Sequence, residues 1–357
     1  MSDSFLMTAA GDIVIRHPLF GEGAINSDGF ARLMADMAKG DLVWGSCEVQ
    51  FSTRGFRTDS TIAYLVPPRV GGDLGKAGFN VMTVATNHTW DYGPDAFLDT
   101  LDVLREGGVE PVGGGRTPED AWRPLVRDIN GVRVGILAAS CLVPPYYAAL
   151  PDRPGIAAVR VRQLAALDPI GMMIEPGAPI KMESHAEPED VDILVDAIRR
   201  LKADTDVTIV SMHWGYGRGT PLATYQRPLA RQIVEAGADM ILGNHGHSPT
   251  AVEMIQGKPV VYSLGNNVAQ QDRINATPRQ LEIFEDIDPW SVVADIEIGR
   301  DGIRSITLTP TECQSDGLPI AVSGTPVGQA IVDRVKSLSA RYGTAVEIVA
   351  GKAVIRP

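Results

Sequence analysis

The stretch GADMILGNHGHSPTAVEMIQGKPVVYSLGNNV, residues 237–268, decides the fold of this chain. Residues 239–242 have the pattern of a short buried strand, which stops at Gly243. The turn that follows presents His245 and His247, two imidazoles separated by one glycine. Imidazoles just past a strand end commonly bind a metal ion, but a His-x-His pair alone is equally compatible with two exposed loop histidines.

Polar residues of the same kind stand at the ends of other predicted strands. The predicted strands over 5–10, 41–48, 80–85 and 207–212 deliver Asp12, Glu48, Asn87 with His88, and His213. A single aspartate at such a turn could equally cap it, but four of the six histidines in the chain fall at these turns. Carboxylate, amide and imidazole ligands in this mixture suit Mn, Zn, Fe or Ni, so the set could hold one or two divalent ions.

The composition limits the class of protein. The chain has 357 residues, of which 44% are apolar and 21% charged, and it shows no internal repeat or low-complexity linker. One α/β domain over residues 1–357 with an ample core is the simplest partition. The formal net charge of −12 argues against a nucleic-acid partner, because such a surface needs a basic stripe.

Cysteine usage and the N-terminus indicate a compartment. Cys47, Cys141 and Cys313 match no zinc motif and cannot form a closed set of disulfides, which suggests a reducing environment. Residues 1–17 lack the basic and apolar regions of a signal peptide, and the chain has no apolar run of transmembrane length. We therefore expect a soluble cytoplasmic protein without a membrane anchor.

Strand and helix patterns alternate along the chain, with a hairpin predicted at Asn130-Gly131. Residues 142–187 are rich in proline, glycine and methionine, and we expect an irregular insertion that acts as a lid; His185 within it is expected at the surface. Residues from about 275 onward are expected to form a C-terminal extension. Three glycines at 113–115 could cradle a phosphate, but they match no known phosphate-loop pattern.

A series of motifs stands in order along the chain: Gly11-Asp12, Glu48, ATNHTWDYG (85–93), VGGGRTPEDAWRP (112–124), SMHWGYG (211–217), GADMILGNHGHSP (237–249) and YSLGN (262–266). Together they resemble the bacterial capsule-synthesis protein CapA family, also called the poly-γ-glutamate synthesis family. The fold of that family is related to calcineurin-like metallophosphoesterases. The alternation of elements supports only an α/β fold, whereas the resemblance implies a metallophosphatase-like four-layer α/β/β/α sandwich of two mixed sheets.

The resemblance also implies roles for individual residues. It implies metal binding by Asp12, Glu48, Asn87, His213, His245 and His247. His88 would be the general acid or a transition-state stabiliser, and we expect Asp91 to be catalytic beside it. Tyr262 and Asn266 would support the site or line the substrate pocket.

Two positions depart from the family pattern. Val14 stands where the phosphoesterases have the histidine of an Asp-x-His motif, so one metal position is weakened and a single ion is compatible with the sequence. Ser46-Cys47 replaces the Asn-Leu that usually precedes Glu48, which leaves Cys47 either as an extra soft ligand or as a buried thiol.

These observations support two principal hypotheses. The first is a soluble metal-dependent hydrolase in which a metal-activated water attacks an amide, lactam or ester, or a phosphoester. Its substrate would be small and carboxylate-bearing or of γ-glutamyl type, with Arg54, Arg57 or Arg218 holding the carboxylate or phosphate. The second is an accessory component of poly-γ-glutamate or capsule biosynthesis without hydrolytic activity. A binding protein with incidental histidines is a third reading, and a homo-oligomer is compatible with all three.

Overall fold

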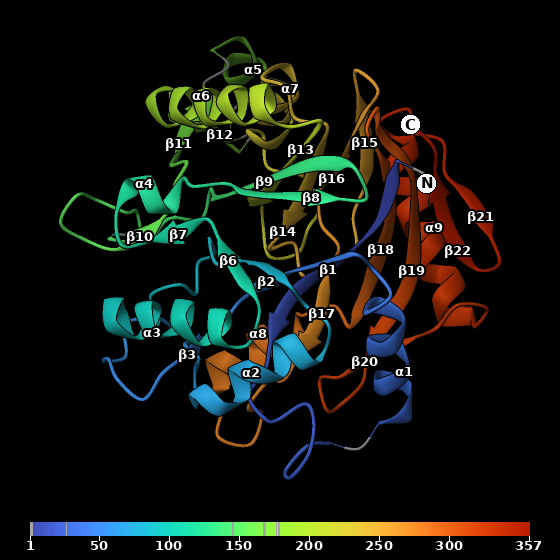
Figure 1. Ribbon diagram of the computed structural model, residues 1–357. Coiled ribbons are helices and arrows are strands. Elements are labelled where there is room, and N and C mark those ends of the chain that lie inside the picture. The colour runs from blue at the N-terminus through green and yellow to red at the C-terminus, as the bar shows by residue number, and fades with distance from the viewer. Residues whose placement is uncertain (1–2, 26, 145, 167–168, 176, 178) are drawn as a thin grey trace.

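The computed structural model describes residues 3–25, 27–144, 146–166, 169–175, 177 and 179–357. Two mixed β-sheets pack face to face, and helices cover their outer faces (Figure 1). The larger sheet contains β1 (Ser4–Val14), β2 (Leu42–Cys47), β5 (Val81–Thr83), β6 (Glu110–Val112), β17 (Asn266–Ala269), β18 (Trp290–Gly299), β19 (Gly302–Cys313), β20 (Pro319–Ala321), β21 (Glu347–Val349) and β22 (Lys352–Ile355). Its strand order is β21-β22-β19-β18-β1-β2-β5-β6, with β17 also paired to β1 and β20 to β19.

The smaller sheet carries the stretch from which the fold was inferred. It contains β8 (Leu125–Ile129), β9 (Val132–Ser140), β13 (Val207–His213), β14 (Met240–Asn244), β15 (Val252–Ile255) and β16 (Lys258–Val261), in the order β15-β16-β14-β13-β9-β8. The predicted hairpin between β8 and β9 is confirmed, because Asn130 and Gly131 take φ values of 50° and 81° in its turn. Positive φ at both central residues is the conformation that favours an Asn-Gly turn.

The core is divided by the sheets into three layers of side chains. Alternate residues of β13 show the division: Ile209 packs between the two sheets, whereas Val210 packs under the helices of the outer face. On the larger sheet the outer helices are α1 (Asp28–Met37), α2 (Pro68–Lys76) and α3 (Gly93–Glu106), and on the smaller sheet α6 (Pro188–Asp204) and α7 (Gln226–Glu235). The four-layer α/β/β/α prediction is therefore confirmed.

Helix α1 illustrates how the sequence specifies this layering. Ser27 caps its N-terminus by accepting a hydrogen bond from the Phe30 amide. Phe30, Leu33, Met34 and Met37 recur at helical spacing, and all are buried against the larger sheet. A further helix, α9 (Pro326–Ala340), packs against β15 of one sheet and against β19 and β22 of the other.

The remaining elements are short: α4 (Pro118–Ala121), α5 (Pro169–Ile174), α8 (Pro278–Glu285), and the paired strands β3 (Gln50–Phe51) with β4 (Leu65–Val66), β7 (Gly114–Gly115) with β10 (Gly155–Ile156), and β11 (Val161–Ala166) with β12 (Lys181–Ala186). No helix in the described ranges combines the length and the apolar character needed to cross a membrane.

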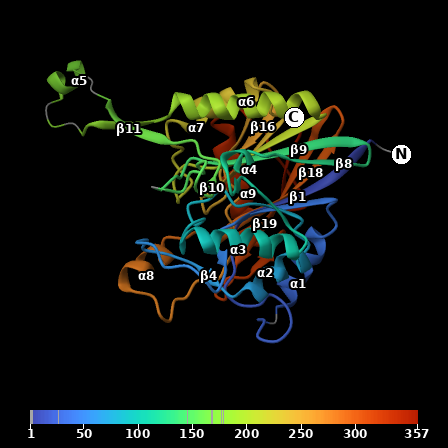
Figure 2. The same cartoon turned by 60° about the vertical axis from the view of Figure 1, so that its left-hand side comes forward.

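The expected irregular insertion at 142–187 contains regular structure, so that part of the prediction is wrong. Strands β11 and β12 form an antiparallel hairpin, an arm that projects from the body of the molecule with α5 near its tip (Figure 2). Most residues of both strands are exposed on both faces, so no alternation of apolar and polar residues marks them in the sequence. His185 is exposed on this arm. Residues 145, 167–168, 176 and 178 of the predicted lid lie outside the described residues.

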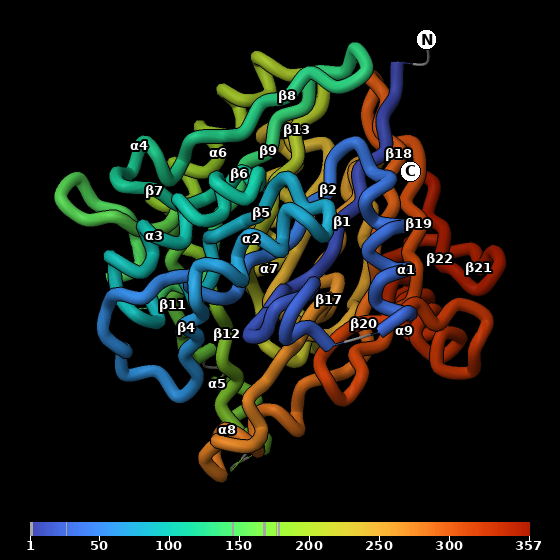
Figure 3. Tube along the Cα trace, turned by 60° about the horizontal axis from the view of Figure 1, so that its bottom comes forward, coloured from blue at the N-terminus to red at the C-terminus, as the bar shows by residue number. Residues whose placement is uncertain are grey.

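The segment beyond about residue 275, expected as a C-terminal extension, contributes central strands to the larger sheet. Residues Ser4 to Ala9 of β1 pair with β18, and β18 pairs along its length with β19 (Figure 3). The first and the last quarters of the chain therefore lie side by side. This pairing fixes the position of β1 in the sheet, and the C-terminal half of β1 forms part of the candidate site.

Candidate metal centre

The strand ends of both sheets meet at one edge of the molecule. Strands β1, β2 and β5 run parallel in the larger sheet, and β13 and β14 run parallel in the smaller one. Their carboxyl ends supply Asp12, Glu48, Asn87, His213, His245 and His247. The structure therefore brings together all six residues that were expected to bind metal, and ligand sites at the carboxyl ends of parallel strands are common in α/β proteins.

Asp12 and His213 occupy the centre of this group. The Asp12 carboxylate accepts a hydrogen bond of 2.9 Å from the His245 amide, and it lies 3.3 Å from Nδ1 of His247. His213 Nε2 lies 2.8 Å from Asn87 Oδ1 and 3.2 Å from Glu48 Oε1. Ligand atoms of Asp12, Glu48 and His213 all lie within 4.8 Å of one another, which is a separation that one ion can bridge.

Several buried atoms in this group make no hydrogen bond within the described part of the chain. They are Asp12 Oδ1, Glu48 Oε1, His213 Nδ1 and His245 Nδ1. Buried polar atoms in folded proteins are nearly always paired, and leaving one unpaired costs roughly 1–3 kcal/mol. A divalent cation would satisfy these oxygen and nitrogen atoms together, so the residues present fit a metal ion.

Burial also sets the protonation of the central histidines. It lowers the pKa of His213 to about 3 and holds the pKa of His245 well below its usual value. Both imidazoles are therefore neutral at pH 7, and the neutral form is the one that binds a metal. Burial, reinforced by the Asp12 carboxylate, raises the pKa of Glu48, as expected for two carboxylates that share a buried site.

The His245-Gly246-His247 turn has an unusual backbone. His245 and His247 take φ values of 78° and 46°, in the left-handed region that residues other than glycine rarely occupy. Such a conformation costs about 1–3 kcal/mol and persists where the surroundings enforce it. Here the His245 amide is bound by Asp12, and Nδ1 of His247 lies 2.8 Å from Asn266 Oδ1.

His88 and Asp91 form a pair beside the metal ligands. His88 Nδ1 lies 2.8 Å from Asp91 Oδ2, and this oxygen also accepts a 2.8 Å hydrogen bond from the Tyr64 amide. Burial alone would lower the pKa of His88, but the Asp91 carboxylate outweighs it and the pKa rises to about 8. With Nδ1 held by Asp91, Nε2 is the nitrogen that His88 can offer to a bound molecule.

These side chains open on a cavity of about 720 Å³. Glu48, Asn87, His88, His245 and His247 form its inner wall. Its other walls come from four segments, with residues Ser60, Thr61, Ile62, Tyr64, Tyr216, Gly217, Arg218, Thr220, Pro221, Asn266, Gln271, Ile283, Asp286 and Ile287, and Val14 also lines it. We call this space the main cavity.

The family follows from a match over most of the chain. Residues 6–271 match the model of the family described as bacterial capsule synthesis protein PGA_cap. The chain belongs to this family. The matched range contains every residue of the candidate metal centre, and it ends before α8.

Individual relatives are distant. A probable polyglutamine synthesis accessory protein of Mycobacterium tuberculosis is 30% identical, over 67% of this chain and 53% of its own length. The PGA biosynthesis protein CapA of Bacillus subtilis is 29% identical, over 54% of this chain and 43% of its own. The chain thus spans about half the length of these two relatives. A crystal structure of a phosphatase from Mycoplasma pneumoniae is similar at 16% identity, with a TM-score of 0.48 over 87% of this chain and 94% of that one.

Of the five residues expected to bind substrate, Arg218 and Asn266 line the main cavity. The other three do not. Arg54 binds Asp99 through Nε at 3.0 Å, and Arg57 donates to the Ser60 carbonyl at 2.7 Å. Tyr262 is buried.

The Tyr262 side chain serves the core of this PGA_cap chain. Its hydroxyl donates a 2.7 Å hydrogen bond to Glu253, and its ring stacks on Trp214 with centroids 5.6 Å apart. Cys47 is also buried, and its thiol donates a hydrogen bond of 3.4 Å to the Val49 carbonyl. Among the described residues, the group whose ligand atoms lie within 4.8 Å of one another contains Asp12, Glu48 and His213 but not Cys47.

Sequence reasoning missed the outer wall of the main cavity. Residues 277–288 were not assigned to a helix, but the structure has α8 there; its Ile283 lines the cavity, and Gln280 Nε2 donates to the carbonyl of Thr61, another lining residue, at 2.8 Å. A capping box between Thr277 and Gln280, followed by Pro278 at the first helical position, begins this helix. That Thr-Pro-x-Gln pattern is visible in the sequence and could have predicted α8.

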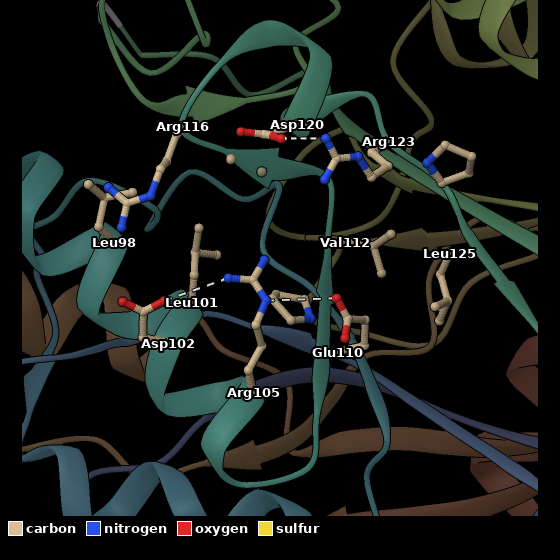
Figure 4. A pocket seen from close by; sticks show the side chains of 14 residues that line it. Leu98, Leu101, Asp102, Arg105, Glu110, Val112, Arg116, Asp120, Arg123 and Leu125 are labelled. Atoms are coloured by element: carbon tan, nitrogen blue, oxygen red, sulfur yellow. Dashed lines mark hydrogen bonds and ion pairs between the residues drawn. The ribbon is translucent and has the colours of Figure 1, made fainter.

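A separate cavity of about 390 Å³ lies between the edge strands β6 and β8 (Figure 4). Two of the three arginines that line it face carboxylates: Arg123 lies 2.7 Å from Asp120, and Arg105 lies between Asp102 and Glu110 at 3.7 and 3.8 Å. Gly115 lines it, but a Cβ atom there would lie 2.3 Å from that of Asp120, so this glycine serves close packing with α4. The structure gives no support to a phosphate cradle at 113–115.

Proposed function

We propose that this PGA_cap protein is a metal-dependent hydrolase. The observation that carries the proposal is the set of unpaired buried ligand atoms on Asp12, Glu48, His213 and His245, beside a His88–Asp91 pair that faces the same cavity. A purely structural cluster would be expected to pair these atoms. A site with ligands on one wall and a proton donor on the next has the parts that hydrolysis requires.

The metal would be held by Asp12, Glu48, Asn87, His213, His245 and His247. One or two ions of Mn, Zn, Fe or Ni suit these ligands. A bound divalent ion would polarise a substrate oxygen and make water a better nucleophile at neutral pH.

The protein's own side chains would orient the substrate and move the proton. His88, held through Nδ1 by Asp91, would donate a proton from Nε2 to the leaving group. Arg218 would bind a substrate carboxylate, since Arg218 lines the main cavity and its contact with Asp286, at 2.5 Å, is an exposed ion pair that a ligand can replace. Asn266 would keep the His247 ring oriented.

We infer an amide, lactam or ester substrate, carboxylate-bearing or of γ-glutamyl type, ahead of a phosphoester. The name of the Bacillus subtilis relative, a PGA biosynthesis protein, supports a γ-glutamyl compound. Val14 lines the cavity at the position where the phosphoesterases have a histidine. This apolar side chain also favours an amide, lactam or ester substrate over a phosphoester. The cysteine usage supports a cytoplasmic location, and the substrate would be a small molecule rather than a nucleic acid.

The names of the relatives also favour a second candidate function. The Mycobacterium tuberculosis relative is described as an accessory protein of polyglutamine synthesis, so this chain could assist polymer assembly without hydrolysing anything. In that case the metal would be structural. A catalytic test separates the two functions.

The test is hydrolysis by the metal-reconstituted protein of γ-glutamyl amides, lactams, carboxylate esters and aryl phosphates. We expect turnover of a C–N or ester substrate, and a loss of at least ~100-fold in kcat in the His88→Asn variant with metal content unchanged. Arg54→Gln is the matched control, because Arg54 binds Asp99 outside the cavity, and its kcat should match the wild type. Metal binding without turnover of any of these compounds would favour the accessory role.

A further inference from the structure

The candidate metal centre opens on two cavities rather than one. Beside the main cavity lies a space of about 470 Å³, which we call the side cavity. Asn87, Tyr216 and His245 line both cavities, so the two meet at the metal centre. The side cavity is completed by Cys141, Leu142, Val143, Pro144, Val161, Gln163, Ser184, Gly215 and Tyr225.

The loop at 215–219 forms the partition between the two spaces. Gly217 lies directly against the histidines, since a Cβ atom there would lie 3.6 Å from His247 and 3.8 Å from His245. The Tyr216 side chain, 46% exposed, faces both cavities. If the bond to be hydrolysed lies at the metal centre, the part of the substrate on one side of that bond would therefore occupy the main cavity, and the part on the other side would occupy the side cavity.

The two cavities differ in chemistry. None of the described residues that line the side cavity is an acidic side chain, lysine or arginine, and Leu142, Val143, Pro144 and Val161 give it an apolar wall. Two of its buried polar side chains already have partners: Tyr225 accepts from the Gly215 amide at 2.7 Å, and Ser184 lies 3.0 Å from the Thr224 hydroxyl. The main cavity, by contrast, contains Arg218, Asp286, Glu48 and His88.

We propose that the substrate is an N-acyl amino acid or a compound of that class, with an apolar acyl group in the side cavity and a carboxylate-bearing amine in the main cavity. This deepens the hydrolase proposal and rests on it, and among the substrates named there it selects a carboxylate-bearing amide over a compound with a γ-glutamyl acyl group. The orientation follows from His88, which lines only the main cavity, so the group that it protonates must leave on that side. Arg218 on the same side would bind the carboxylate of the leaving amine.

The reaction is a simple hydrolysis. The oxygen of water bonds to the acyl carbon, the C–N bond breaks, and the leaving nitrogen takes a proton from His88. His88 recovers a proton that is released from the attacking water. The products are a carboxylic acid, held in the side cavity, and a free amino acid in the main cavity.

Binding to the metal-reconstituted protein tests the proposal, with N-octanoyl-glutamate, N-acetyl-glutamate and γ-glutamyl-glutamate as probes in calorimetric titrations. Each buried methylene strengthens binding, so the octanoyl compound should bind at least ~10-fold more tightly than the acetyl compound. It should also bind more tightly than γ-glutamyl-glutamate, whose acyl part is charged.

Two variants place the effect in the side cavity. Gln163→Trp fills it from an exposed strand position and should abolish the preference for the octanoyl group. Leu164→Trp is the matched control, because the next residue of a strand points to the opposite face and Leu164 lines neither cavity; it should keep the preference. Equal binding of the octanoyl and acetyl probes, or an unchanged preference in Gln163→Trp, would overturn the proposal.

Hydrolysis of the same probes separates this inference from the function on which it rests. Turnover of N-acetyl-glutamate and γ-glutamyl-glutamate without any effect of acyl length would support a hydrolase and overturn the two-cavity assignment. A preference for octanoyl-glutamate that Gln163→Trp abolishes, with no turnover of any probe, would support the assignment of the cavities to a bound ligand and contradict the hydrolase.

Discussion

Gly11 and Gly265 touch through their backbones: a Cβ atom on Gly11 would lie 1.7 Å from the carbonyl oxygen of Gly265. The Asp12 amide donates a 3.0 Å hydrogen bond to the same oxygen. This contact sets Asp12 opposite Asn266 in the pairing of β1 with β17. Because Asp12 lies at the centre of the candidate metal centre and Asn266 lies 2.8 Å from His247, the contact between the two glycines positions both parts of this site.

Gly11→Ala should therefore damage both stability and metal binding. The added methyl group must push β1 and β17 apart, and overpacking of this kind costs about 3 kcal/mol in the free energy of unfolding. Urea unfolding and elemental analysis of the purified variant measure the two effects.

Gly72→Ala is the control for that substitution. Gly72 lies in α2, and a Cβ atom there would meet nothing within 4 Å. Alanine is favoured over glycine inside a helix by roughly 0.5–1 kcal/mol, so this variant should be as stable as the wild type or more so, with normal metal content. An equal loss of stability in both variants would mean that the contact with Gly265 is not the cause.

Tyr262→Phe should weaken the fold without changing the metal centre. The variant loses the hydrogen bond from the hydroxyl to Glu253, which also binds Arg227 at 2.7 Å. A hydrogen bond to a charged group contributes roughly 1.5–3 kcal/mol, so thermal and urea unfolding should show a loss of this size. Metal content and KM should stay at wild-type values. A raised KM would instead indicate that Tyr262 contributes to substrate binding.

Asp239→Asn should produce a stability loss that depends on pH. Burial raises the pKa of Asp239, but Lys202 at 2.7 Å, Lys258 at 2.8 Å and the Thr208 amide outweigh it and hold the pKa below its ordinary value of 3.8. A depressed carboxylate pKa gives stability that is present above the ordinary value and is lost as the pH falls below it. At pH 7 the variant should be about 2 kcal/mol less stable than the wild type.

Urea unfolding at pH 7, 5 and 3.5 checks the sign of this effect. The difference between Asp239→Asn and the wild type should be equal at pH 7 and 5 and should shrink at pH 3.5. Asp36→Asn, which removes an exposed ion pair with Lys39, should cost less than about 0.5 kcal/mol at any of these pH values. A difference that already shrinks between pH 7 and 5 would contradict the assigned direction.

The convergence of these residues on one candidate site could be predicted because their signals are local. An apolar run that ends in a histidine or carboxylate is visible in a few residues, as at 207–213 and 239–245, and parallel strands bring such ends to one edge. The prediction of four layers also required the family resemblance, because alternation of strands and helices indicates only an α/β fold.

The predictions that Arg54 and Tyr262 bind substrate differ from the structure because only the fold brings each side chain to its partner. No residue near Arg54 in the sequence indicates that its guanidinium binds Asp99, which is 45 residues away. Tyr262 faces Glu253 only because β15 and β16 pair, and its position in a conspicuous motif suggested the pocket instead. The arm at β11 and β12 was missed for a different reason, because strands without a buried face carry no alternating pattern.

The central claim is that these strand ends form a metal centre, and elemental analysis tests it most directly. The purified protein, as isolated and after reconstitution with Mn, Zn, Fe or Ni, should contain about one or two equivalents of metal. His213→Ala and His245→Ala should lose that metal and remain folded by circular dichroism, whereas His185→Ala, altered on the exposed arm, should keep it. Wild-type metal content in both His213→Ala and His245→Ala, or no bound metal in the wild type under any of these conditions, would contradict the account.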